Sequence, residues 1–105
     1  MASIYSAEIS DPASFASYVS QMVYTAMRAQ DILRDKFDPE MPQGPDGYSL
    51  SISDEGEPHM TFYTRCTQTW LMRDELRNIF NEASDKGVSI TYSFQPPEAR
   101  QYQQN

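Results

Sequence analysis

The chain has little of several residue types on which recognisable chemistry depends: its 105 residues include one cysteine, one histidine and four glycines. The single Cys66 cannot form an intrachain disulfide, which excludes a disulfide-stapled secreted scaffold and fits a reducing compartment. Cys66 and His59 together are too few to supply the ligands of a zinc site. The four glycines form no glycine-rich phosphate loop. We therefore expect neither a bound metal nor a cofactor.

Basic residues and long apolar runs are also scarce. Eight Lys and Arg residues stand against 15 Asp and Glu residues, which gives a net charge of −7. Nucleic acids and anionic membrane surfaces attract clustered Lys and Arg, so direct binding to either is disfavoured. No segment approaches the roughly 20 apolar residues that span a bilayer, and the first residues lack the basic and apolar regions of a signal peptide. We expect a cytoplasmic protein.

The acidic residues are concentrated in one part of the chain. Six of them, and no base, lie between Phe37 and Pro58, and they account for all but one unit of the net charge. These six are Asp38, Glu40, Asp46, Asp54, Glu55 and Glu57. They fall in two connections that a strand of about 20 Å would separate, and neither connection has the ligand offsets of a calcium loop. They either form solvated turns or contact a basic partner.

Three segments alternate between apolar and Ser or Thr residues, which is typical of strands with one buried face. They are residues 48–53, 59–64 and 88–94. Two further segments place apolar residues three and four positions apart, which predicts amphipathic helices. The first begins at Asp11-Pro12 and ends near Phe37, and the second begins near Thr67 or Thr69 and ends at Lys86, before Gly87. Residues 4–10 show a weaker strand pattern.

This element order predicts a ferredoxin-like β-α-β-β-α-β sandwich, an α+β fold with an antiparallel sheet and two helices on one face. If residues 1–9 are not a strand, the fold becomes a three-stranded relative of the same sandwich. We expect a single domain over residues 1–94 and a flexible C-terminal tail over 95–105.

The first helix would be about 39 Å long at 1.5 Å per residue, about twice the length of the strands. Its overhanging end must be covered by the proline-containing loop after it, shortened by a break near Gln30-Asp31, or docked against a partner. The sheet face away from the helices should carry mainly Ser and Thr, with Tyr63 and Arg65. Tyr63 is its only aromatic residue, which disfavours RNA binding by base stacking.

His59 and Cys66 do not predict a nucleophile with its base. Seven positions apart on one extended run, they would lie on opposite faces and about 20 Å apart. A Ser-His-Asp triad would need His59, and no G-x-S-x-G turn presents a serine. We expect His59 to be a solvated surface group and Cys66 a small buried hydrophobe.

The leading hypothesis is a small, acidic, non-enzymatic adaptor or inhibitor that binds a basic surface of another protein, with electrostatic steering of the encounter. One version is a phage-type inhibitor of a nucleic-acid-binding protein. The expected partner-binding residues are Asp38, Glu40, Asp46, Asp54, Glu55, Glu57, Tyr63 and Arg65.

Two alternatives from other classes stay open. The first is a small-molecule-binding or enzymatic dimeric α+β-barrel protein, whose cavity would involve Tyr18, His59, Trp70 and Tyr92. The second is a structural subunit of a larger assembly, a homodimer included, connected through the long first helix and the glutamine-rich tail.

Overall fold

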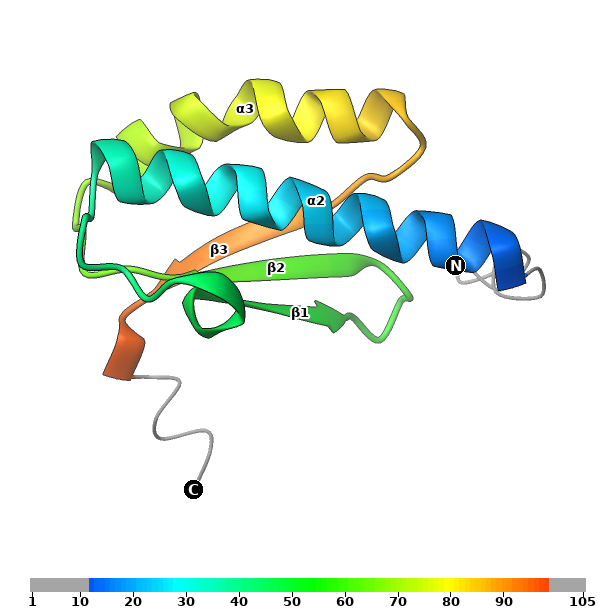
Figure 1. Cartoon of the computed structure of the whole chain (residues 1–105), viewed down its shortest axis with the longest axis horizontal. Helices are drawn as coiled ribbons and strands as arrows, with labels where there is room; N and C mark the ends of the chain where they lie inside the picture. Colours follow the sequence, from blue (N-terminus) through cyan, green and yellow to red (C-terminus); the bar gives the residue numbers. More distant parts are fainter. Residues whose placement is uncertain (1–11, 99–105) are drawn as a thin grey trace.

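The computed structural model describes residues 12–98 of the chain. In order, they form helix α2 (Pro12–Lys36), the 3₁₀ helix η1 (Gly44–Gly47), strands β1 (Tyr48–Ile52) and β2 (Pro58–Tyr63), helix α3 (Thr69–Asp85) and strand β3 (Thr91–Gln95). Both α-helices lie on one side of the sheet (Figure 1). The predicted strand at residues 1–9 and residues 99–105 of the predicted tail lie outside the described residues.

The three described strands form a mixed sheet in the order β1-β2-β3. Strand β1 pairs antiparallel with β2, with Leu50 opposite Met60, whereas β2 pairs in parallel with β3, with Phe62 beside Phe94. The α+β fold with two helices is confirmed, but the expected antiparallel sheet is wrong for the pair β2–β3. Helix α3 supplies the crossover that parallel neighbours need. In a four-stranded ferredoxin-like sheet the first strand would lie between these two, so their direct pairing leaves no place for it there.

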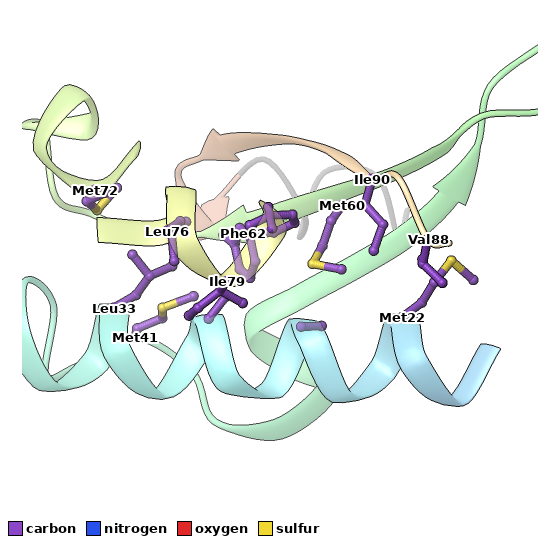
Figure 2. Packing of buried hydrophobic residues seen from close by; sticks show 13 residues of the cluster. Met22, Leu33, Met41, Met60, Phe62, Met72, Leu76, Ile79, Val88 and Ile90 are labelled. Atoms are coloured by element: carbon purple, nitrogen blue, oxygen red, sulfur yellow. The ribbon is translucent and has the colours of Figure 1, made fainter. Parts of the chain in front are cut away.

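The core lies between the helices and one face of the sheet. From α2, Met22, Ala26, Ala29 and Leu33 are buried at the predicted three- and four-residue steps. From α3 and the sheet come Met72, Leu76, Ile79, Phe80, Ala83, Met60 and Phe62. Figure 2 shows large members of this cluster meeting between the helices and the strands. Each large buried side chain contributes about 1.5–3 kcal/mol, so this contact orients both helices on the sheet.

Helix α3 ends as the sequence predicts. Gly87 adopts a φ of +89°, while Val88 N–H donates to the Ala83 carbonyl and Gly87 N–H to that of Ser84, each at 3.0 Å. These two bonds form the glycine-dependent Schellman ending of a helix. The last strand begins at Thr91 rather than at the predicted Val88. Val88 and Ile90 are nevertheless buried in the connection to it.

The proline-containing loop after α2 covers the C-terminal half of that helix. The Gln30 side-chain amide donates to the carbonyls of Pro42 and Gly44, both at 2.9 Å, and Arg34 Nε donates to the Met41 carbonyl at 3.0 Å. The Met41 side chain is buried in the core cluster with Leu33. Of the three explanations for the helix length, cover by the loop is therefore observed, and the helix has no break near Gln30-Asp31.

Two ion pairs join α2 to the antiparallel helix α3 at the surface. Arg28 lies 2.7 Å from Glu82, and Lys36 lies 2.8 Å from Glu75. The hydrogen bond from Arg28 lowers the pKa of Glu82 below its ordinary value. These pairs engage two of the eight Lys and Arg residues of the chain in contacts between its own helices.

Candidate interaction surfaces

The turn between β1 and β2 is tightly hydrogen-bonded. Ser53 N–H donates to the Glu57 carbonyl and Gly56 N–H donates to the Ser53 carbonyl, both at 2.9 Å. The Ser53 hydroxyl also accepts from Glu57 N–H at 3.1 Å. Gly56 has a φ of +84°, in the region that favours glycine. The backbone of this turn is therefore held in one conformation.

The same turn exposes three carboxylates and one apolar side chain. Asp54, Glu55 and Glu57 are exposed, and within residues 12–98 none of their carboxylates takes part in a hydrogen bond or ion pair. Ile52, the last residue of β1, is 47% exposed. We call Ile52, Asp54, Glu55 and Glu57 the acidic turn. It places an exposed apolar side chain beside three unpaired carboxylates on a hydrogen-bonded turn.

The three predicted acids of the loop after α2 differ from one another in exposure. Asp38 is buried, and its Oδ2 accepts from Thr64 Oγ1 at 2.8 Å and from Arg65 N–H at 2.9 Å. This carboxylate joins the end of α2 to the end of β2, so its role in the fold is structural. Glu40 and Asp46 are exposed. Their loop and the acidic turn lie at opposite ends of β1, as the sequence predicts (Figure 1).

The sheet face away from the helices carries a hydrogen-bonded row around His59. Its Nδ1 lies 2.8 Å from Thr91 Oγ1 and its Nε2 lies 2.9 Å from Ser93 Oγ. The Thr91 hydroxyl also donates to the Pro58 carbonyl at 3.3 Å. His59 is thus half-buried with both ring nitrogens engaged, not the solvated group that the sequence predicts. The parallel pairing of β2 and β3, which the sequence pattern missed, brings these residues together.

The Ser93–His59 contact has the distance of a nucleophile and its base, but among residues 12–98 the rest of a hydrolytic site is not assembled around it. A hydroxyl, Thr91, stands where a catalytic triad places the carboxylate that orients and charges the imidazole. The row lies on regular strands, whose amide groups pair within the sheet instead of converging on an oxyanion. We interpret it as a cross-strand hydrogen-bond network that stabilises the sheet.

The two predicted contact residues at the end of β2 differ in accessibility. Tyr63 is 3% exposed, and its hydroxyl lies 3.1 Å from Ser49 Oγ. Arg65 is exposed and forms an ion pair with Glu98 at 3.2 Å. Because Tyr63 and Thr61 are buried within one chain, this face is less open than the sequence predicts.

The hollow beside Cys66 is small. It lies at the carboxyl ends of β2 and β3, where Cys66 is half-buried, and has a volume of about 170 Å³. Pockets for small-molecule ligands are usually about 300–1,000 Å³. Two of its polar groups are already engaged, since Thr64 donates to Asp38 and Arg65 pairs with Glu98. The hollow therefore gives little support to the small-molecule alternative.

One surface is not marked as a contact surface by the sequence reasoning. Trp70, in the first turn of α3, is 62% exposed, and Arg73 and Arg77 follow it at steps of three and seven on the same helix face. We call these three residues the Trp70 face. The signal was present in that spacing, because Trp70 lies on the side of α3 away from its buried apolar stripe. Behind the face, burial raises the pKa of the Tyr92 phenol, whose hydroxyl donates to the Arg73 carbonyl.

Comparison with known proteins supplies no relative: no family model, no curated protein and no solved structure matches the chain. Among residues 12–98, no helix is long and apolar enough to cross a membrane. The same residues contain no group of three or more His, Cys, Asp or Glu side chains placed to hold a metal ion.

Proposed function

We propose that this protein is a non-enzymatic protein-binding module, an adaptor or inhibitor, whose acidic turn docks on a basic surface of another protein. The observation that carries the proposal is the pairing state of Asp54, Glu55 and Glu57. Elsewhere in residues 12–98, Glu75, Glu82 and Glu98 each neutralise a cation, whereas these three carboxylates neutralise none. Charge left uncompensated on a fixed turn is available to a partner.

The exposed Ile52 beside the carboxylates supports a contact that is more than long-range attraction. Charged groups around an interface mainly raise the association rate and select the partner, whereas buried apolar anchors supply most of the affinity. In this proposal the carboxylates orient a basic surface and Ile52 is buried against it. The proposed contact set is therefore the acidic turn alone. Glu40, Asp46 and Arg65 are exposed but lie at the other end of the β1–β2 pair, and Asp38 and Tyr63 are buried.

The kind of target, the cellular location and a strand at residues 1–9, all expected from the sequence, belong to the same proposal. A target that binds nucleic acid would offer the clustered Lys and Arg that the acidic turn requires, which supports the function of an inhibitor of such a protein. A reducing, cytoplasmic location fits the unpaired Cys66. A strand formed by residues 1–9 would bring the fold closer to the four-stranded sandwich, at an edge of the sheet and not between β2 and β3.

The test is affinity capture from an extract of the organism that encodes the chain, with bound proteins identified by mass spectrometry. The turn-reversed variant (Asp54→Lys, Glu55→Lys, Glu57→Lys) should capture at least about tenfold less of a basic protein than the unmodified chain, because electrostatic steering raises association rates about 10- to 1,000-fold. The matched control is Glu40→Lys with Asp46→Lys, which reverses charge at the other end of β1. Equal capture by the turn-reversed variant would refute the role of the turn.

A further inference from the structure

The Trp70 face combines a large exposed ring with cationic side chains. Trp70 is 62% exposed, more than the other exposed large apolar residues Tyr24, Met27 and Ile52, at 51%, 51% and 47%. Trp and Arg are enriched among the residues that dominate binding energy in protein interfaces. A tryptophan left in water on a regular helix, with arginines three and seven positions on, therefore has the composition of a contact surface.

The cations of this face are less committed than the three that link segments of the fold. Arg28, Lys36 and Arg65 each pair with a glutamate of another segment. Arg73 forms no ion pair among residues 12–98, and Arg77 pairs only with Asp74 on its own helix, where both side chains are more than 60% exposed. Such an exposed pair is worth about 0–1 kcal/mol, so Arg77 can exchange Asp74 for another carboxylate.

The acidic turn is the chemical complement of this face. It places the exposed Ile52 next to three unpaired carboxylates, whereas the Trp70 face places an exposed ring next to two guanidinium groups. Guanidinium groups bind carboxylates through strong, charge-assisted hydrogen bonds. Both surfaces belong to one chain, so every copy carries a donor and an acceptor for the same contact.

We propose that the Trp70 face of one copy docks on the acidic turn of a second copy, with Ile52 packed against the Trp70 ring and Arg73 and Arg77 facing Asp54, Glu55 and Glu57. Because the two surfaces differ, the contact is head-to-tail and either closes into a ring or extends as a chain. The proposal builds on the proposed function in using the same turn, so a basic partner and a second copy compete for it. A net charge of −7 on each copy opposes the association, which makes it weak and concentration-dependent.

The experiment uses the purified full chain, in which Trp70 is the only tryptophan and so reports directly on this surface. Sedimentation velocity and Trp70 emission are measured over a concentration series. The unmodified chain should gain mass as concentration rises, and Trp70 emission should shift to shorter wavelength in the same range. The Trp70→Ala variant should lose most of the mass gain, whereas Met27→Ala, which truncates an exposed side chain on the outer side of α2, should keep it.

Charge exchange between variants tests the pairing itself. The face-reversed variant (Arg73→Glu, Arg77→Glu) and the turn-reversed variant should each associate at least about tenfold more weakly than the unmodified chain, one tenfold step being about 1.4 kcal/mol. An equal mixture should recover association, because each variant then offers the surface that the other one lacks. Circular dichroism checks that both variants fold, which is expected because all five positions are exposed.

Three results would overturn the proposal: an unmodified chain that stays monomeric with constant Trp70 emission up to about 1 mM, the weak limit of useful affinity; variants that associate as well as the unmodified chain; or a mixture that does not recover. A chain that stays monomeric while its Trp70 face captures a foreign acidic protein would likewise overturn the proposal. Failure of the self-association proposal is distinguishable from failure of the proposed function, since the face-reversed variant should still capture a basic partner.

Discussion

Single residues in this chain divide into those that hold its segments together and those left available at the surface. Asp38 shows the first kind, because its buried carboxylate accepts from Thr64 and from the Arg65 backbone. Glu55 shows the second kind, since its carboxylate is exposed on a turn fixed by backbone bonds. Sequence alone places both in acidic connections. Asp38 is buried and Glu55 is not, because the end of α2 lies next to the end of β2.

At the residue scale, Asp38→Ala should lower the free energy of unfolding by about 1–3 kcal/mol, because it leaves the Arg65 N–H and the Thr64 hydroxyl without their acceptor. Asp38→Asn retains an acceptor oxygen and should cost less. Urea unfolding followed by circular dichroism measures both. The exposed Glu40→Ala serves as control and should change stability by less than about 0.5 kcal/mol. An Asp38→Ala variant as stable as this control would contradict the structural role.

At the scale of elements, the loop between α2 and β1 depends on close contact with the helix. Gln30 holds it through the carbonyls of Pro42 and Gly44, and Gly47 lies against the Gln30 amide and the Pro42 carbonyl so closely that a Cβ atom would overlap both. The loop in turn places Met41 over the end of α2. The loop therefore covers the C-terminal part of a 25-residue helix that is much longer than the strands of five or six residues beneath it.

Gly47→Ala should therefore lower the free energy of unfolding by about 1–3 kcal/mol, the usual range for overpacking, with the loss of one or both Gln30 bonds in addition. Gly44→Ala is the comparison: its Cβ would meet nothing within 4 Å, but the φ of +61° imposes about 1–2 kcal/mol of backbone strain. Thermal unfolding should rank Gly47→Ala below Gly44→Ala in Tm. The reverse order would show that the loop yields easily and that the contact with Gln30 is not a constraint.

At the scale of the whole molecule, the sequence predicted the elements better than their assembly. Strand parity, the Pro12 helix start and the Gly87 helix end were readable because each depends on local chemistry. The parallel pairing of β2 with β3 was not, since periodicity says which face a residue occupies but not which strand lies beside it. The same gap hid the His59 network. The exposure of Trp70, in contrast, depends only on the local helix pattern, since its position lies on the side of α3 away from the buried stripe.

Three separate surfaces of the molecule carry exposed charges. The acidic turn follows β1, the loop that carries Glu40 and Asp46 precedes it, and the Trp70 face lies on the first half of α3. In this account the turn receives either a basic partner or a second copy. We propose that the chain is a connector, with specificity from charge placement and affinity from a few apolar side chains.

The most direct test of the central claim is the association rate between this chain and its captured basic partner as a function of ionic strength. We predict that the rate constant for the unmodified chain falls steeply as salt rises, because the Debye length shrinks from about 30 Å at 0.01 M to about 8 Å at 0.15 M. The charge-neutral variant (Asp54→Asn, Glu55→Gln, Glu57→Gln) should start at least about tenfold slower at low salt and show a much shallower slope. Parallel slopes and equal rates for the two proteins would contradict the claim that the acidic turn guides the encounter.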